Sequence, residues 1–105
     1  MDLVIVGGGA IGCLYGYYLG RAGNRITIVD TDNEVARCLE DRGLGFMGIG
    51  ETNPKSISYV PVDAAVDAEQ INRCDLVLLT VKSAATADAA RSVAHLISPE
   101  TPLLS

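Results

Sequence analysis

Gly7-Gly8-Gly9-Ala10-Ile11-Gly12 is the stretch that decides the fold of this chain of 105 residues. It is a G-x-G-x-x-G motif that follows a short β-branched run at residues 3–6 and opens an apolar, helically spaced segment at residues 10–22. Strand, glycine turn and helix therefore stand in the order found in βαβ units that bind dinucleotides. The motif predicts a dinucleotide site at the start of the chain.

Each position of the motif has a physical role in such a site. Gly7 allows the tight turn off the strand, Gly9 has no Cβ to hold the backbone away from a pyrophosphate, and Gly12 lets the helix press against the sheet. Ala10 and Ile11 begin the helix, where free N–H groups and a partial positive charge favour phosphate. We therefore predict that these five residues bind the cofactor.

A second strand supplies the acidic residue that the glycine motif needs. Residues 25–29 form a predicted strand that ends at Asp30, 18 residues after Gly12. This is close to the spacing at which a carboxylate accepts hydrogen bonds from a ribose. A carboxylate there repels the 2′-phosphate of NADP(H) by about 1 to 4 kcal/mol at 4 Å, depending on the local dielectric. Asp30 therefore favours NAD(H), although Arg37 is near enough in sequence to reach a phosphate.

Composition limits the function further. The net charge of -5 and the lack of a Lys/Arg cluster argue against nucleic acid or an anionic membrane as partners. Residues 3–20 carry no charge, but this run is rich in glycine and divides into a strand and a helix, so we predict no membrane span.

The cysteines carry no metal or disulfide pattern. The three cysteines, Cys13, Cys38 and Cys74, form no C-x-x-C motif, and their number is odd. Both features are typical of free thiols in a reducing cytoplasm. We therefore expect no metal site and a cytoplasmic location. Cys13 follows the motif directly; it is either a small packing residue or a thiol whose pKa is lowered by the helix N-terminus. We favour the packing residue, and interpret His95 likewise as a surface or packing side chain.

The remaining pattern predicts a Rossmann-type α/β fold, in which a doubly wound, mostly parallel sheet has helices on both faces. We expect one NAD(P)-binding domain over residues 1–105. The second helix should place Val35, Cys38 and Leu39 on one face, and the last helix Ala90, Val93, Ala94 and Ile97. Beyond residue 30, the predicted elements are helix 32–42, strands 44–50 and 56–62, a short helix or helical turn at 63–73, strand 76–81, helix 84–98 and a strand from 101.

Three expectations concern the pairing of the strands, the position of the site and the extent of the domain. Strands 44–50 and 56–62, joined by a polar turn, form either a hairpin or a βαβ continuation. In a doubly wound sheet strand 76–81 neighbours the first strand, which brings Thr80, Val81, Lys82 and Ser83 to the cofactor. The chain stops inside its last predicted strand, which indicates a fragment of a longer protein.

Three stretches together resemble the N-terminal domain of the ketopantoate reductase (2-dehydropantoate 2-reductase) family. They are residues 4–12, the pair of short strands after the second helix, and Asp75-Leu76-Val77-Leu78-Leu79-Thr80-Val81-Lys82-Ser83. The last is the more specific, because a strand followed by Val-Lys-Ser and an alanine-rich helix is much rarer than the glycine motif. The resemblance covers essentially the whole chain.

The resemblance implies a function and also its limits. It implies that this domain holds a nicotinamide dinucleotide, generally NADP(H) in the family, that Lys82 lies near cofactor and substrate, and that a second, helical domain completes a cleft for a small 2-oxo acid. It also implies that the general acid and the substrate-binding residues come from that second domain. We therefore expect this chain to contain no catalytic residue, apart from possible support by Lys82, and to bind cofactor with little catalysis. We expect the complete protein to be a homodimer.

Two alternatives remain open at this stage. The glycine motif suits the FAD of a flavoprotein oxidase equally well, although residues 76–83 have no counterpart there. An NAD(H)-sensing regulatory domain would use the same fold without a catalytic partner. Fold alone does not decide among these functions.

Overall fold

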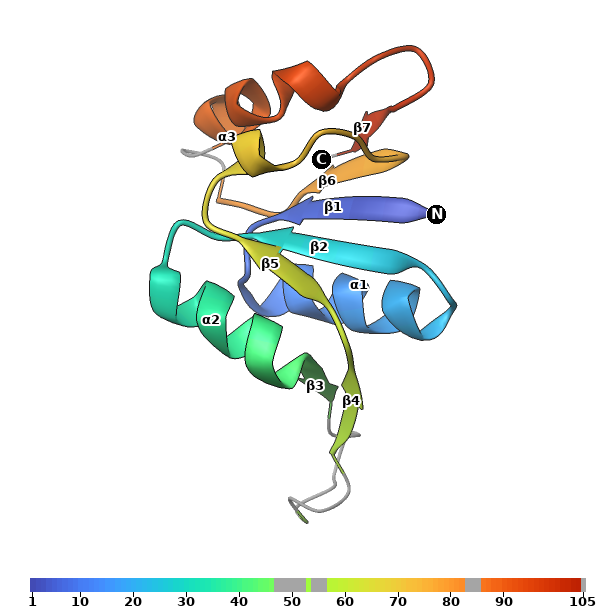
Figure 1. The fold of residues 1–105 in the computed structure, drawn as a ribbon, viewed down its shortest axis with the longest axis vertical. Coiled ribbons are helices and arrows are strands. Elements are labelled where there is room, and N and C mark those ends of the chain that lie inside the picture. The colour runs from blue at the N-terminus through green and yellow to red at the C-terminus, as the bar shows by residue number, and fades with distance from the viewer. Residues whose placement is uncertain (47–52, 54–56, 83–85, 105) are drawn as a thin grey trace.

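A five-stranded, fully parallel sheet forms the centre of the molecule (Figure 1). The computed structural model describes residues 1–46, 53, 57–82 and 86–104. The sheet order is β5-β2-β1-β6-β7, and a separate pair, β3 and β4, is antiparallel. The strands are β1 (Asp2–Val6), β2 (Arg25–Val29), β3 (Leu44–Phe46), β4 (Ser58–Val60), β5 (Asp63–Ala65), β6 (Leu76–Leu79) and β7 (Leu103–Leu104). The helices are α1 (Ala10–Arg21), α2 (Asn33–Arg42) and α3 (Thr86–Ser92), with the 3-10 turns η2 (Ala68–Gln70) and η4 (Ala94–Leu96).

The sheet is doubly wound, as the sequence predicts. β1 lies at its centre and pairs in parallel with β2 on one side and with β6 on the other, so that Val6 stands between Val29 and Leu79. The predicted neighbourhood of strand 76–81 and the first strand is therefore confirmed. The glycine turn, the end of β2 and the end of β6 all reach the carboxyl edge of the sheet.

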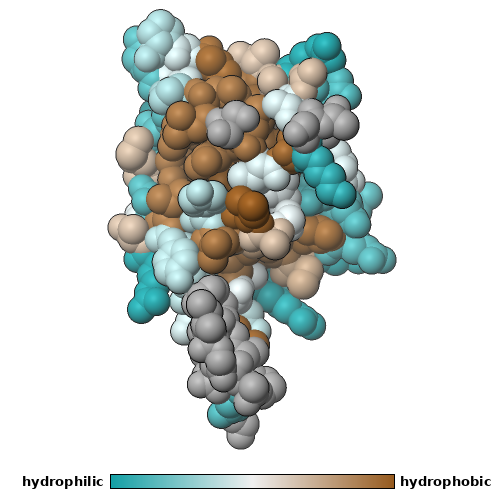
Figure 2. Space-filling model, turned by 180° about the vertical axis from the view of Figure 1, so that it is seen from behind, coloured by the Kyte–Doolittle hydropathy of each residue, from teal (hydrophilic) through white to brown (hydrophobic). Residues whose placement is uncertain are grey.

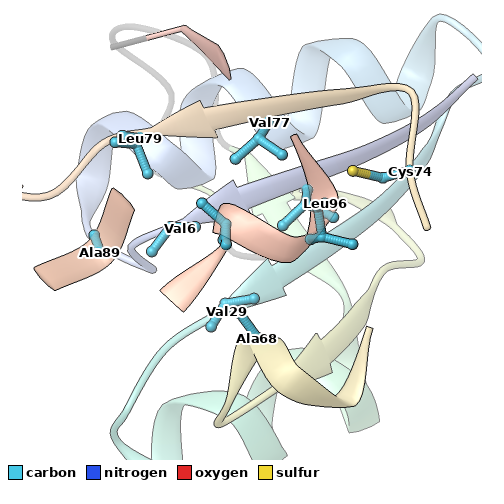
Figure 3. Packing of buried hydrophobic residues seen from close by; sticks show 10 residues of the cluster. Val6, Val29, Ala68, Cys74, Val77, Leu79, Ala89 and Leu96 are labelled. Carbon is cyan, nitrogen blue, oxygen red and sulfur yellow. The ribbon is translucent and has the colours of Figure 1, made fainter. Parts of the chain in front are cut away.

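Helices cover both faces of the sheet because consecutive side chains of a strand point to opposite sides. On one face Ile5 and Ile28 are fully buried, in a cluster that includes Tyr17 of α1 and Leu39 of α2. On the other face Val77 is equally buried, among residues from α3, η2 and η4 (Figure 3). The predicted Rossmann-type α/β fold with helices on both faces is thus confirmed.

One predicted element is confirmed only in part. The helical turn predicted within residues 63–73 is the 3-10 turn η2, but Asp63–Ala65 form strand β5 instead. The sequence Asp63-Ala64-Ala65 has no β-branched run, so its strand conformation comes from pairing with β2, in which Ala64 lies beside Ile28. The Asp67 side chain then accepts a hydrogen bond from the Glu69 N–H (3.0 Å) and begins the 3-10 turn. This edge strand adds a fourth strand end, after those of β1, β2 and β6, to the carboxyl edge of the sheet.

The two short strands after α2 form the predicted hairpin-type pair. β3 and β4 are antiparallel, with Leu44 opposite Val60. β4 is shorter than the predicted strand 56–62, and residues 47–50 of the other predicted strand lie outside the described residues. Of the polar turn predicted at 51–55, only Asn53 belongs to the described residues. The glycines of α1 explain why this pair lies close against that helix. A Cβ on Gly16 would come within 2.7 Å of Leu44, and one on Gly20 within 2.6 Å of Val60.

Two predicted helix faces are also wrong in detail. In α2 the buried residues are Ala36 and Leu39, whereas Cys38 is exposed. The last predicted helix is divided, because Leu96 N–H donates to the Val93 carbonyl in a 3-10 pattern (2.8 Å). The tighter turn changes the buried set: Ala89, Val93 and Leu96 are buried, while Ala94 and Ile97 are exposed.

Hydrophobic residues also gather on the back of the molecule, as the space-filling view shows (Figure 2). The large apolar side chains that α1 exposes to solvent are Ile11, Leu14, Tyr15 and Tyr18. No helix in the described part of the chain has both the length and the apolar character needed to cross a membrane.

Candidate functional site

Backbone hydrogen bonds tie the strand ends together at the carboxyl edge of the sheet. The Gly7 N–H donates to the Val29 carbonyl (2.8 Å), the Asp30 N–H to the Ala65 carbonyl (3.0 Å) and the Thr80 N–H to the Val6 carbonyl (2.9 Å). The predicted site residues of three separate segments therefore lie at one edge. In open α/β sheets this edge is where ligands bind.

The glycine turn has a tightly constrained side and an open side. Gly7 has φ of +112°, a conformation that L side chains rarely adopt, and a Cβ on Gly12 would overlap the Gly7 carbonyl oxygen. At Gly9, by contrast, an added Cβ would meet no atom within 4 Å. The turn thus packs closely against the protein at Gly7 and Gly12 and faces open space at Gly9.

The N-terminus of α1 has no side-chain cap. Its N-cap residue is Gly9, its first turn contains no acidic residue, and Ala10 and Ile11 are exposed. The first N–H groups of a helix lack partners within the helix and carry the positive end of its dipole. This arrangement accepts an anion such as a phosphate group without any further charged side chain.

Asp30 has structural partners that the sequence did not reveal. It is half-buried, its Oδ2 accepts a hydrogen bond from the Gly8 N–H (2.9 Å), and its Oδ1 accepts one from the Asp32 N–H (2.9 Å). Gly8 is therefore also part of the site, and a Cβ on it would come within 2.6 Å of Asp30 Oδ2. Each carboxylate oxygen has a second lone pair, so Asp30 can hold the turn and still accept hydrogen bonds from a ligand.

Two cavities flank the glycine turn. The first, which we call the Asp30 cavity, has a volume of about 440 Å³ and is bordered by Gly7, Asp30, Val66, Asp67, Val81 and Asp88, among others. The second, the Lys82 cavity, has a volume of about 600 Å³ and is lined by Gly9, Ala10, Ile11, Tyr15 and residues 78–82. Val81 borders both. A ligand that lies across the turn therefore reaches a cavity at either end.

The two cavities differ in charge. Three carboxylates, those of Asp30, Asp67 and Asp88, border the Asp30 cavity, whereas Lys82 is the charged residue of the other. The sequence did not indicate Asp67 or Asp88 as site residues. Strand β5, which precedes Asp67, was not predicted, and the pattern of α3 does not show which elements this helix packs against. Lys82 itself is exposed, and Ser83 lies outside the described residues.

A larger cavity, of about 790 Å³, lies at the opposite edge of the sheet, around Asp2, Arg25 and Asp63 at the amino ends of their strands. Arg25 and Asp63 form an exposed ion pair there (2.9 Å). No residue of the glycine turn borders this cavity. Volume alone therefore does not make it the better candidate.

Cys13 is a packing residue, not an activated thiol. Its Sγ donates to the Gly8 carbonyl oxygen (3.3 Å), and partial burial raises the pKa of the thiol, with a further increase from the Asp30 carboxylate. Both effects favour the packing residue over a thiol with a lowered pKa. His95 is exposed, as expected for a surface side chain, and its Nε2 lies 2.9 Å from the Ile71 carbonyl oxygen. Among the described residues, no three His, Cys, Asp or Glu side chains are grouped to hold a metal ion.

The sequence of this chain is similar to those of ketopantoate reductases. The family model described as "Ketopantoate reductase PanE/ApbA" matches residues 3–105. The 2-dehydropantoate 2-reductase of Pyrococcus abyssi is 32% identical over 97 residues, which are 92% of this chain and 30% of that protein. The corresponding protein of Streptococcus pyogenes serotype M1 is 26% identical over 104 residues, or 99% of this chain and 32% of its own length.

Solved structures show the same fold. A PanE/ApbA family ketopantoate reductase from Ralstonia eutropha JMP134 superposes with a TM-score of 0.81 at 30% identity, covering 100% of this chain and 33% of that one. D-mandelate dehydrogenase with NADH and anilino(oxo)acetate superposes with a TM-score of 0.80 at 24% identity, covering 100% and 33%, and shares the fold. The chain thus spans about a third of the length of the proteins it matches.

Proposed function

The chain belongs to the ketopantoate reductase PanE/ApbA family, and from this we propose that it is the cofactor-binding domain of an oxidoreductase that reduces a 2-oxo acid with NAD(P)H. The observation that carries the proposal is the uncapped N-terminus of α1, which lies at the carboxyl edge of the sheet beside the open space at Gly9. A pyrophosphate fits these donors and this space.

The proposed binding mode follows the two cavities. The pyrophosphate lies on the turn and the start of α1, against Gly7, Gly9, Ala10, Ile11 and Gly12. The adenosine occupies the Asp30 cavity, where Asp30 accepts hydrogen bonds from the ribose. The nicotinamide occupies the Lys82 cavity beside Thr80, Val81 and Lys82. Support for this mode is that Val81 borders both cavities, so one extended ligand can contact both.

When bound, the nicotinamide supplies a hydride to the keto carbon of the substrate. The residues of this chain bind and orient the cofactor, and Lys82 adds a positive charge to the cavity in which the reacting groups would meet. Hydride transfer also requires a held substrate and an acid for the developing alkoxide. We place those groups in the part of a full-length family member that this chain does not cover, and expect the chain alone to bind cofactor without appreciable turnover.

We propose NAD(H) as the cofactor in preference to the NADP(H) implied by the family resemblance. The support is electrostatic, because Asp30, Asp67 and Asp88 border the proposed adenosine cavity. A single carboxylate 4 Å from a 2′-phosphate opposes it by about 1 kcal/mol in water and about 4 kcal/mol at an effective dielectric of 20. The D-mandelate dehydrogenase structure that shares this fold was solved with NADH.

The test is a parallel calorimetric titration of the chain with NADH, NADPH and FAD, repeated with Asp30→Ala. We expect NADH to bind most tightly, and the variant to lose about tenfold in NADH affinity and most of its discrimination against NADPH. Tighter binding of NADPH by the wild-type chain would overturn the cofactor preference, and binding of FAD alone would favour the flavoprotein alternative. The unfolding temperature of the variant is the control, since Asp30 also accepts the Gly8 and Asp32 N–H groups.

A further inference from the structure

We propose that Thr80 is a positioning residue that fixes the glycine turn in its pyrophosphate-binding shape, rather than a residue that binds cofactor through its hydroxyl. The inference rests on the proposed function, and it changes the role that the sequence predicts for this side chain. Its basis is a pair of hydrogen bonds between segments that lie far apart in sequence. Thr80 Oγ1 lies 3.0 Å from the Val6 carbonyl oxygen and 3.1 Å from the Gly7 carbonyl oxygen.

These two carbonyls are the point at which the chain leaves β1 and enters the turn. A hydroxyl has one proton, so Thr80 shares its proton between the two oxygens. The Thr80 N–H also donates to the Val6 carbonyl (2.9 Å). The start of the turn is therefore held to the end of β6 by both the backbone and the side chain of one residue.

The hydroxyl lies within the contact between the turn and α1. A Cβ built on Gly12 would come within 2.6 Å of Thr80 Oγ1, and one built on Gly7 within 3.0 Å. Both hydroxyl contacts are made to protein oxygens. The hydroxyl proton is thus directed at the turn, and its effect on a ligand is transmitted through the turn.

The turn needs such a contact because glycine has more conformational freedom than other residues. On the β2 side, the Gly7 N–H donates to Val29 and the Gly8 N–H to Asp30. On the β6 side, the Thr80 hydroxyl is the contact that fixes the Gly7 carbonyl. Holding the turn from both sides sets the direction of the free N–H groups at the start of α1, and a preorganised site binds more tightly than a mobile one.

The experiment compares two fragments of the cofactor with three versions of the chain. ADP contains the pyrophosphate, whereas adenosine contacts the Asp30 cavity alone. Thr80→Val keeps the shape of the side chain and removes the donor, and Thr80→Ser keeps the donor. We expect Thr80→Val to weaken ADP binding about tenfold and to leave adenosine affinity within about twofold, in NMR-monitored titrations. Thr80→Ser should restore ADP binding to nearly the wild-type level.

The outcomes separate this inference from the proposed function. Wild-type protein that binds neither ADP nor NADH overturns both. Wild-type binding with an unchanged ADP affinity in Thr80→Val overturns the role of Thr80 alone. An equal loss of ADP and adenosine affinity, or a loss that Thr80→Ser does not restore, would show a general structural effect and also overturns it. Unfolding in urea, measured for all three chains, identifies a variant that is simply unfolded, in which case Thr80→Ala replaces Thr80→Val.

Discussion

The two long helices α1 and α2 begin at the same edge of the sheet but begin differently. α2 starts at Asp32, whose carboxylate accepts hydrogen bonds from the Glu34 N–H (2.9 Å) and the Val35 N–H (3.5 Å). Its first turn also contains an acidic side chain, Glu34. α1 starts at Gly9, has no capping side chain and has no acidic residue in its first turn. The N–H groups at the start of α2 thus have a side-chain acceptor within the chain. Those at the start of α1 have no such side-chain acceptor and can bind an acceptor on a ligand.

The difference separates a structural helix end from a functional one. A good N-cap stabilises a helix by about 1 kcal/mol relative to alanine, and glycine supplies part of that without a side chain. α1 therefore gives up some stability at its first turn, and the space beside Gly9 remains open. We infer that a ligand anion takes the place that the Asp32 carboxylate has on α2. Exchanging the two arrangements tests this interpretation.

Giving α1 the cap of α2 should have the largest effect. The backbone of Gly9 is extended (φ −76°, ψ −174°), a conformation open to any residue, and no atom would obstruct a Cβ there. In Gly9→Asp the new carboxylate would accept the first-turn N–H groups and repel the pyrophosphate. We expect about a hundredfold loss of NADH affinity with an unchanged or slightly increased free energy of unfolding. Fluorescence titration and urea unfolding measure the two quantities.

Matched variants at the same position divide that effect into its parts. Gly9→Ala adds a methyl group and tests close approach alone, whereas Gly9→Ser adds a neutral cap. The expected order of NADH affinity is wild type, then Ala and Ser, then Asp. If Gly9→Asp binds NADH as tightly as the wild type does, the start of α1 is not the pyrophosphate site.

Removing the cap from α2 should have the opposite and smaller effect. Asp32→Ala leaves the Glu34 and Val35 N–H groups without their acceptor, which costs about 1 kcal/mol of unfolding free energy. The Asp32 N–H still donates to Asp30, so the proposed ribose contact is retained. We therefore expect NADH affinity to stay within about twofold of the wild type, as measured in the same two assays. A large loss of binding with unchanged stability would contradict the distinction between the two helices.

The sequence predicted the elements whose signal is local. The β-branched run of β1, the leucine-rich apolar run of β6 and the glycine motif can each be recognised within a few residues. β5 was missed because its alanines have little strand preference of their own, and its place is fixed by pairing with β2. Missing β5 also meant missing part of the candidate site, because Val66 and Asp67 follow this strand and border the Asp30 cavity.

The contacts that hold the site together were also beyond prediction. The Gly8–Asp30 and Thr80–Gly7 hydrogen bonds join residues 22 and 73 positions apart. Sequence reasoning placed Asp30 and Thr80 at the edge of the sheet, because parallel strands share their carboxyl edge. It had no means of finding which backbone groups their side chains contact. The sequence pattern thus located the candidate site, and contacts between distant segments determine its shape.

The two helices also carry a matched pair of chemical probes, for which the smallest effect is expected. Cys13 lies in the first turns of α1, half-buried, and Cys38 lies exposed on α2. Burial and the Asp30 carboxylate raise the pKa of the Cys13 thiol above its ordinary value of 9.0. At pH 8 we therefore expect iodoacetamide to alkylate Cys38 several times faster than Cys13, because the thiolate is the reactive form. Mass spectrometry of the labelled peptides measures both rates in one sample.

The sign of the pH dependence and the effect of ligand follow from the same geometry. A thiol whose pKa is higher in the folded chain than in the unfolded one contributes stability below about pH 9, and this contribution is lost as the pH rises through the folded pKa. Cys13→Ser should therefore slightly reduce the fall in unfolding free energy between pH 8 and pH 10. Bound NADH should slow Cys13 alkylation further and leave Cys38 unchanged, since only α1 is proposed to receive the ligand. Equal protection of both thiols by NADH would mean that the ligand acts on the whole fold and not at the start of α1.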